Sequence, residues 1–388
     1  MEAFTFNTAE LILLSAAGIL FIIQLIYYFG LYNRIHVRNK TVRKEETHFS
    51  RELPPLSVIL CARNEADNLR KILPAILEQD YPQFEVIVIN DASTDETEDV
   101  LGYMEEKYPH LYHSFTPDSA RYISHKKLAL TLGIKASKHD WLVFTETNCM
   151  PASNQWLKLM ARNFTSQTQI VLGYSGYDRI KGWLHKRIAF DTLFQSLRYL
   201  GFALAGNPYM GIGRNMAYRK ELFFKNKGFS KFLHLHYGDD DLFINEIANR
   251  TNTRVEISEA GQMTATYQDN YEAWKELKLQ YDFTSKYLHT TAKSIFGIAK
   301  FFDYAFDILF VCLWVEGIIH NWTTAVLASI LALSLFSIKV IVYRRAAKIL
   351  RKPRLFFSLP FFSFIQPCIN LYFKVIGSVT RKKNFTWR

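Results

Sequence analysis

The sequence predicts an α/β fold with a doubly wound, mostly parallel sheet that is attached to a membrane by apolar segments. Two observations lead to this prediction. From residue 55 onward, short apolar runs alternate with amphipathic stretches at the interval typical of strands and helices in a parallel sheet. Before and after that part, the chain has apolar runs long enough to cross a bilayer.

The first apolar run, residues 11–33, contains no charged residue. Glu2 and Glu10 precede it without any lysine or arginine, whereas a signal peptide has a basic start and a shorter apolar core. We therefore expect a retained transmembrane anchor within residues 1–33. A basic juxtamembrane linker is expected to follow it over residues 34–54.

The central part of the chain reads as alternating strands and helices. Strands are expected at Leu56–Cys61, Phe84–Ile89 and Trp141–Phe144, and helices at Glu65–Leu77, Glu96–Lys107 and His125–Ala136. Ser93 and Glu96 have the spacing of a capping box, which predicts where the second helix starts. In such sheets, ligands bind at the carboxyl ends of the strands.

Polar residues follow each predicted strand, namely Arg63-Asn64-Glu65, Asn90-Asp91 and Glu146-Thr147-Asn148. Each group alone is compatible with ordinary turn chemistry. Their convergence on one edge of one sheet favours a ligand site. The sequence has no glycine-rich phosphate loop, which argues against nucleotide hydrolysis and dinucleotide redox chemistry, and no C-x-x-C pair, which argues against zinc.

Three adjacent carboxylates, Asp239, Asp240 and Asp241, are the most informative short motif. Adjacent carboxylates repel one another, so a fold seldom keeps them together unless a metal, a cationic ligand or proton transfer uses them. The alternative is an acidic turn that caps a helix beginning near Leu242.

The apolar character returns after residue 300, in segments 304–320, 322–343 and 355–377. The second segment is the clearest candidate span, because Glu316 weakens the first and two prolines interrupt the third. The third segment is expected to enter and return, or to lie in the interface. We assign residues 291–388 to a C-terminal membrane region.

The net charge of +11 is concentrated beside these apolar segments. Basic clusters follow the first anchor and the 322–343 segment, as the positive-inside bias predicts. This placement favours a multi-pass protein of the cell membrane over a nucleic-acid-binding protein. Residues 34–300 are then cytoplasmic, and the loop at 320–322 is external.

The segments Ser57–Glu65, Gln79–Pro82, Phe84–Asp91 and Ser93–Asp95 resemble the opening of glycosyltransferase family 2. This family comprises inverting enzymes of the GT-A fold. Gly211–Arg219 resembles the family's loop near the acceptor, and Gly238–Phe243 resembles its catalytic acidic motif. The resemblance implies a GT-A catalytic domain over residues 55–290.

The resemblance also implies roles for individual residues. A nucleotide sugar, expected to be a UDP-sugar, would donate one sugar to a lipid or lipid-linked acceptor at the cytoplasmic face. Asp240 would be the general base, with Asp239 beside it, and Asp241 has no assigned step. The sugar donor would be bound by Ala62, Arg63, Asn64, Glu65, Asp91 and Lys127, and the acceptor and diphosphate by Gly213, Arg214, Asn215 and Gln280.

Two departures from the family pattern matter. Glu146 and Asn148 replace the D-x-D motif that holds a divalent cation, so we expect weak Mg²⁺ or Mn²⁺ binding, with metal dependence left open. Of the Q-x-x-R-W motif only Gln280 remains, which argues against a polymer synthase. Lys126, Lys127 and Arg214 are candidates to replace the lost positive charge, although both lysines also fit a solvated helix start.

Two other functions stay open. One is a processive polysaccharide synthase, and the other is an inactive relative that acts as a scaffold in glycan assembly. The intact acidic triplet argues against the scaffold.

Overall fold

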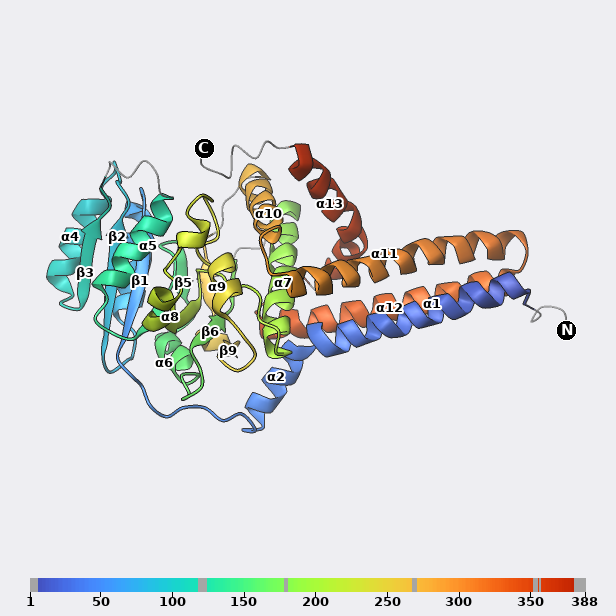
Figure 1. Cartoon of the computed structure of the whole chain (residues 1–388), viewed down its shortest axis with the longest axis horizontal. Helices are drawn as coiled ribbons and strands as arrows, with labels where there is room; N and C mark the ends of the chain where they lie inside the picture. Colours follow the sequence, from blue (N-terminus) through green and yellow to red (C-terminus); the bar gives the residue numbers. More distant parts are fainter. Residues whose placement is uncertain are drawn as a thin grey trace.

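The structure is a computed structural model, and it describes residues 6–117, 124–177, 181–266, 271–351, 355 and 357–379. Figure 1 shows a mixed α/β body from which a bundle of long helices projects. The N-terminal helix α1 (Thr8–Tyr27) runs along two long helices from the C-terminal part of the chain in that bundle, so segments far apart in the sequence lie side by side there.

The body is organised around a seven-stranded sheet with the order β3-β2-β1-β4-β8-β6-β9. Its neighbouring strands are parallel except at β8, which is antiparallel to both β4 and β6. The strands are β1 (Leu56–Ala62), β2 (Phe84–Asn90), β3 (Leu111–Phe115), β4 (Trp141–Phe144), β6 (Ile170–Gly173), β8 (Met216–Arg219) and β9 (Thr253–Glu256).

Helices cover both faces of the parallel part of the sheet because successive strand residues point to opposite faces. Val58 and Leu60 pack with α3 (Ala66–Leu77) and α4 (Thr97–Lys107). On the other face, α5 (His125–Ala136) lies on β1 and β2. A Cβ added to Gly133 of α5 would lie 2.8 Å from the Ile59 side chain, so the absence of a side chain permits this close approach.

A second sheet, with the order β5-β10-β7, packs beside the first. It consists of β5 (Cys149–Pro151), β7 (Ser175–Tyr177) and β10 (Met263–Ala265). The remaining elements of the body are α6 (Trp156–Ala161), α7 (Trp183–Leu204), α8 (Lys220–Lys225), η3 (Ser230–Phe232), α9 (Asp241–Ile247), η4 (Glu259–Gly261) and α10 (Tyr271–Ser285). Among the described residues, most of these elements lie between β5 and α10 and were not predicted.

Within the described part of the chain, three helices are long and apolar enough to cross a membrane: residues 8–32, 322–349 and 359–377. They correspond to α1 with its π-helical end η2 (Tyr28–Tyr32), to α12 (Trp322–Ile349) and to α13 (Leu359–Val379). The predicted segment 304–320 falls within α11 (Thr290–Ile319), which packs against α1 and α12 in the projecting bundle (Figure 1).

Several expectations can now be compared with the structure. The α/β fold class with apolar terminal helices is confirmed. The linker expected at 34–54 instead begins with a helix, α2 (Arg34–Arg43), which packs against α7 and α12. The predicted domain boundaries stay a prediction, and the basic tail after residue 379 lies outside the described residues.

The predicted capping box at Ser93 and Glu96 is wrong. Helix α4 begins at Thr97, and Glu96 makes no side-chain capping bond. The Ser93 hydroxyl instead accepts a hydrogen bond from the Asn64 backbone N–H at 2.9 Å. The serine therefore joins the loops after β1 and β2, a use that local spacing does not reveal.

A junction cluster joins the body to α13; it comprises Arg187, Asp191, Trp274, Lys278 and Gln366. Asp191 accepts hydrogen bonds from Arg187 at 3.0 Å and from the Trp274 indole at 2.9 Å, and Lys278 lies 3.3 Å from it. Arg187 also donates to Gln366 of α13. Arg187 is fully buried, so this cluster clamps α7, α10 and α13 together.

Candidate active site

The loops after β1 and β2 are joined by hydrogen bonds at the carboxyl ends of the strands. Asn64 has a left-handed backbone with φ of 54°, and its side-chain oxygen accepts a hydrogen bond from the Thr94 N–H at 2.8 Å. The Glu65 N–H donates to the Thr97 hydroxyl at 3.0 Å. These bonds tie Asn64 and Glu65, both predicted to bind the sugar donor, to the neighbouring loop.

Asp91 is buried directly after β2, and its N–H donates to the carbonyl of Ala62 at 2.7 Å. Its carboxylate accepts from the Thr116 hydroxyl at 2.7 Å and lies 3.2 Å from His125 Nδ1. Arg63 lies 3.8 Å from the other carboxylate oxygen. Thr116 and His125 were not predicted as site residues, because they approach Asp91 only through the strand order.

The acidic triplet lies at the start of α9. Asp240 is the N-cap of that helix, with its carboxylate accepting from the N–H of Asp241 at 2.7 Å. The other Asp240 oxygen accepts from the Gly213 N–H at 2.8 Å, which joins the two loops that were predicted to lie together in the site. The Asp241 carboxylate accepts from the Leu242 N–H at 2.7 Å. Asp240 therefore caps the helix, which is the alternative that the sequence analysis left open for the acidic triplet.

Lys126, in the first turn of α5, lies between two carboxylates of the site. Its Nζ is 2.9 Å from Glu146 Oε1 and 3.2 Å from Asp239 Oδ2. We call Lys126, Glu146, Asp239 and Asp240 the donor-edge cluster. Lys126 remains 44% exposed and Glu146 34% exposed, whereas Asp239 is buried. The cluster therefore has a charged side that a ligand can reach.

The electrostatics of this cluster follow from its contacts. Burial acts to lower the pKa of Lys126, but the carboxylates of Asp239 and Glu146 outweigh it and raise that pKa well above its usual value. For Glu146, burial acts to raise the pKa, and the positive charges of Lys126 and Arg214 lower it overall. Lys126 and Glu146 are therefore both charged near neutral pH.

Asp240 and Asp241 behave differently from Glu146. Burial and the negative charge of Asp239 raise the pKa of Asp240, partly offset by Lys126 and by the Gly213 N–H. Burial and the charge of Asp240 raise the pKa of Asp241. A raised pKa increases the proton affinity of the carboxylate, which suits a general base that works near neutral pH.

Arg214 and Asn215 were both predicted in the acceptor and diphosphate loop. Arg214 is buried, with its guanidinium carbon 5.2 Å from the Tyr177 ring centre. Asn215 donates to the carbonyls of Tyr174 at 2.8 Å and Gly261 at 3.1 Å, and accepts from Trp156 at 3.0 Å. The Asn215 side chain is thus hydrogen-bonded to other groups of the protein, while Arg214 adds a positive charge to the site.

Lys127 and Gln280 complete the predicted set. The Lys127 ammonium donates to three backbone carbonyls, those of Phe232 at 2.6 Å, Leu235 at 2.8 Å and Tyr237 at 2.8 Å. These bonds use its three N–H groups and support the chain that leads into the acidic triplet. A direct role in binding the sugar donor stays a prediction that these contacts do not favour. Gln280 lies in α10, half-buried.

A cavity of about 750 Å³ lies between this site and the helices α11 and α13. Its lining includes Arg214 and Asp241 of the site, together with Ile308 of α11 and Leu371 of α13. The cavity therefore connects the acidic triplet with α11 and with α13, which is long and apolar enough to cross a membrane.

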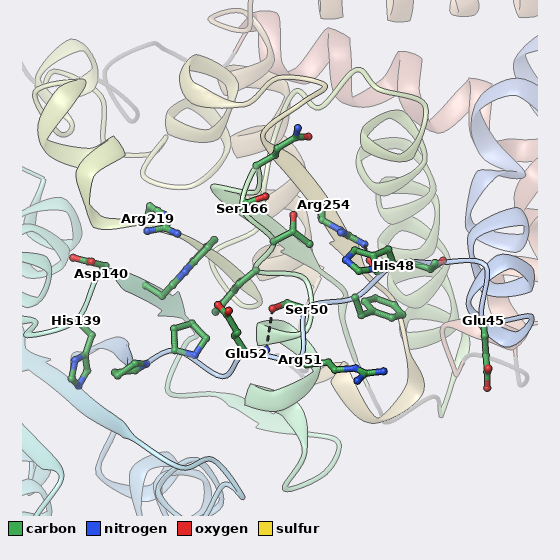
Figure 2. Close-up of a pocket in the computed structure, with 18 of the residues that line it drawn as sticks. Glu45, His48, Ser50, Arg51, Glu52, His139, Asp140, Ser166, Arg219 and Arg254 are labelled. Carbon is green, nitrogen blue, oxygen red and sulfur yellow. Dashed lines mark hydrogen bonds between the residues drawn. The ribbon is translucent and has the colours of Figure 1, made fainter.

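A larger cavity of about 1260 Å³ lies elsewhere. Figure 2 shows its lining, in which Arg254, Arg219 and Asp140 surround the segment that contains His48 and Glu52. It is at the amino end of β4, where Trp141 begins the strand, whereas the residues described above follow the carboxyl ends. Size alone therefore does not identify the active site.

The mostly parallel sheet with the antiparallel strand β8 has the architecture of the GT-A fold. Residues 57–225 match the family model described as glycosyl transferase family 2. This part of the chain, which is less than half of its length, is therefore similar to a glycosyltransferase family 2 domain.

Two curated relatives illustrate the similarity. The probable glycosyltransferase YdaM of Bacillus subtilis is 28% identical over 189 residues, which are 46% of this chain and 43% of the relative. A poly-beta-1,6-N-acetyl-D-glucosamine synthase of Staphylococcus epidermidis is 27% identical over 126 residues, 32% of this chain and 28% of the relative. The chain spans less than half the length of these relatives.

A solved structure supports the fold alone. The mannosyltransferase PcManGT of Pyrobaculum calidifontis, in complex with GDP-Man and Mn²⁺, aligns with a TM-score of 0.51 and 18% identity. The alignment covers 88% of this chain and 97% of that chain, so the likeness includes most of both.

The Mn²⁺ in that neighbour raises the question of whether the residues here fit a metal. Glu146 already accepts from Lys126 at 2.9 Å, and the Asn148 side-chain oxygen accepts from the Cys149 thiol at 3.2 Å. Within the described part of the chain, no group of three or more His, Cys, Asp and Glu is arranged to hold a metal ion. A cation about 4 Å from the ammonium would meet a repulsion of about 4 kcal/mol per unit charge at an effective dielectric constant of about 20. These residues do not fit a preformed metal site.

The sequence analysis named Lys126 as a candidate to replace the lost positive charge but did not assign it to the site, although a further signal was present. Helix α5 starts with His125, Lys126 and Lys127, and no acidic residue lies in its first turn. Cations at a helix N-terminus oppose the helix dipole. Such a start is unfavourable unless carboxylates from elsewhere lie close by, as Glu146 and Asp239 do.

Proposed function

We propose that this protein is an inverting glycosyltransferase that moves one sugar from a nucleotide sugar to a lipid or lipid-linked acceptor at the cytoplasmic membrane face. The main support is the position of Asp240. Its carboxylate accepts hydrogen bonds from the Gly213 and Asp241 N–H groups. Asp240 is a half-buried member of the donor-edge cluster. That arrangement suits a base that accepts a proton from a bound hydroxyl.

In the proposed reaction, Asp240 takes the proton of the acceptor hydroxyl as that oxygen attacks the anomeric carbon. The new carbon–oxygen bond forms opposite the bond to the nucleoside diphosphate, which breaks, and the configuration inverts. Arg214 contributes positive charge near the departing diphosphate. Interactions of this kind are most effective in buried sites with fixed geometry.

The nature of the acceptor is supported by the cavity that reaches Ile308 and Leu371. A lipid whose chain lies among α11 and α13 would present its head group toward Arg214 and Asp241. The basic residues of α2 and of the end of α12 support a cytoplasmic body. The sugar donor is expected to carry UDP, with GDP as the alternative because PcManGT is described with GDP-Man.

A processive polysaccharide synthase is the second candidate, because one curated relative is a synthase of poly-N-acetylglucosamine. The loss of the motif after Gln280 argues against it. Membranes that contain the protein should release a nucleoside diphosphate from a nucleotide-sugar panel when lipid extract is added. A labelled product that extracts into organic solvent supports the lipid acceptor, a polymer supports the synthase, and no release from any nucleotide sugar supports the scaffold.

A further inference from the structure

The position of Lys126 bears on how the sugar donor is held. Its ammonium joins Glu146, which follows β4, with Asp239, which belongs to the loop of the proposed base. The loop after β4 and the loop before α9 therefore meet at one positive charge. The family pattern would have a divalent cation near Glu146.

An ammonium group has three N–H donors. One of them donates to Glu146 at 2.9 Å, Asp239 lies 3.2 Å from the same ammonium as an ion-pair partner, and the side chain is 44% exposed. A further donor is thus within reach of an oxygen atom brought by a ligand. Because two carboxylates hold the ammonium from the protein side, the group is already oriented before a ligand binds.

We propose that Lys126 supplies the fixed positive charge that binds the donor diphosphate, so that binding of the sugar donor needs no divalent cation. This inference rests on the proposed function, because it concerns the same nucleotide sugar. When the bond to the anomeric carbon breaks, negative charge develops on the phosphate oxygen. Lys126 keeps its proton and stabilises that charge through a preorganised hydrogen bond.

Arg214 is the second cation of this site. It is buried, and its charge acts on Glu146 together with that of Lys126. The two side chains supply positive charges from two elements, Arg214 from the loop before β8 and Lys126 from the first turn of α5. In this inference the two protein cations take the place of the divalent cation that the altered metal motif would hold.

The competing mechanism is displacement, in which a divalent cation enters, binds Glu146 and expels the ammonium. The two mechanisms predict opposite effects of removing Lys126. If Lys126 binds the diphosphate, its loss weakens nucleotide binding in every buffer. If a metal displaces Lys126, its loss removes a competitor, and nucleotide binding with Mn²⁺ stays the same or becomes tighter.

The test is nucleotide binding by isothermal titration calorimetry to the full chain in lipid nanodiscs, with UDP, GDP, ADP, CDP and dTDP as ligands. Each is titrated in EDTA and in Mn²⁺. Lys126→Met removes the charge, Lys126→Arg keeps it, and Lys135→Met is the matched control, because Lys135 is an exposed lysine at the far end of the same helix. Intrinsic fluorescence checks that each variant is folded.

We expect the wild type to bind one nucleotide equally in EDTA and in Mn²⁺. Lys126→Met should weaken that binding by roughly tenfold to hundredfold, the size of one charge-assisted hydrogen bond, while Lys126→Arg retains most of it and Lys135→Met all of it. Wild-type binding that requires Mn²⁺, or unchanged binding by Lys126→Met, overturns the inference and leaves the proposed function intact. Failure of the wild type to bind any of the five nucleotides in either buffer overturns the proposed function and the inference together.

Discussion

The molecule contains two clusters of cations and carboxylates that have similar composition but opposite exposure. In the junction cluster, Arg187 is fully buried and Asp191 is 7% exposed in its side chain. In the donor-edge cluster, Lys126 is 44% exposed and Glu146 is 34% exposed. The Arg187–Asp191 pair is closed to solvent and stabilises the fold, and other members of its cluster (Asp191, Trp274, Lys278 and Gln366) also line the 750 Å³ cavity. Lys126 and Glu146 are instead open to a ligand from solvent.

The surroundings of the two clusters explain this difference. Arg187 lies near the rings of Phe190 and Phe362, at 5.3 Å and 5.5 Å from their centres, and these rings exclude water. Lys126 instead lies in the first turn of α5, beside Glu146, which follows the carboxyl end of β4. Removing one partner should thus affect stability at the junction and nucleotide chemistry at the donor edge.

The largest expected effect is that of Asp240→Asn on turnover. The amide is nearly isosteric but cannot accept a proton, so the rate of sugar transfer should fall by about two to four orders of magnitude. Nucleotide binding and the unfolding temperature should stay close to wild type. Steady-state release of nucleoside diphosphate measures the loss, and wild-type turnover by this variant would refute Asp240 as the base.

Arg187→Met is expected to act mainly on stability, because Arg187 itself is not among the residues that line the 750 Å³ cavity. It leaves Asp191 buried with fewer compensating partners, and breaking a buried ion pair on one side costs about 3–5 kcal/mol of unfolding free energy. Denaturant unfolding in detergent should show this loss, while turnover per folded molecule is retained.

Lys275→Met is the control for that measurement. It removes the ion pair between Lys275 and Glu272. Glu272 is 74% exposed, and such surface pairs contribute about 1 kcal/mol or less to stability. If Arg187→Met lost as little unfolding free energy as Lys275→Met, the junction cluster would not be what stabilises the contact among α7, α10 and α13.

The pH profile tests how the donor-edge cluster tunes its base. Because burial and Asp239 raise the pKa of Asp240, its base form is lost as the pH falls through that raised value, and kcat/KM should fall with it. Asp239→Asn removes a neighbouring negative charge, so the acid limb of the profile should move to lower pH. An acid limb that stays in place would mean that another group controls it.

The raised pKa values of Asp240 and Asp241 also make the folding stability depend on pH, in the direction opposite to that of turnover. The folded state binds more protons than the unfolded state between the usual aspartate pKa and the raised one. The contribution of Asp240 and Asp241 to stability is therefore fully present below that usual pKa. It is lost as the pH rises through the raised pKa, and thermal unfolding of wild type and Asp241→Asn across this range reports it.

Asp241→Asn should give the smallest effect on turnover. Its carboxylate accepts from the Leu242 N–H at the start of α9, and an interaction with a helix terminus is worth about 1 kcal/mol or less. Sugar transfer should remain within roughly fivefold of wild type, since 1 kcal/mol corresponds to about that factor. If this variant lost turnover and Asp240→Asn did not, the base would be Asp241.

Much of the parallel half of the body was predictable. The observed bounds of α5 and β4 equal the predicted ones, because Trp141–Phe144 is a short buried run and His125–Ala136 has a clear apolar face. The long stretch between β5 and α10 was not predicted. Helix α7, which has many buried residues, packs against the short strands β7 and β9 of this stretch. The sequence of such short strands alone does not show that a helix covers them.

The sequence by itself determined the order of strands and helices at the start of the body, the apolar terminal helices and the acidic triplet, because these depend on periodicity and on neighbouring residues. Only the tertiary structure decided which charges meet. Lys126 and Lys127 are adjacent and chemically identical, yet one faces Glu146 and Asp239 while the other donates to three carbonyls. Successive residues of a helix point about 100° apart, so their partners depend on segments that are distant in the chain.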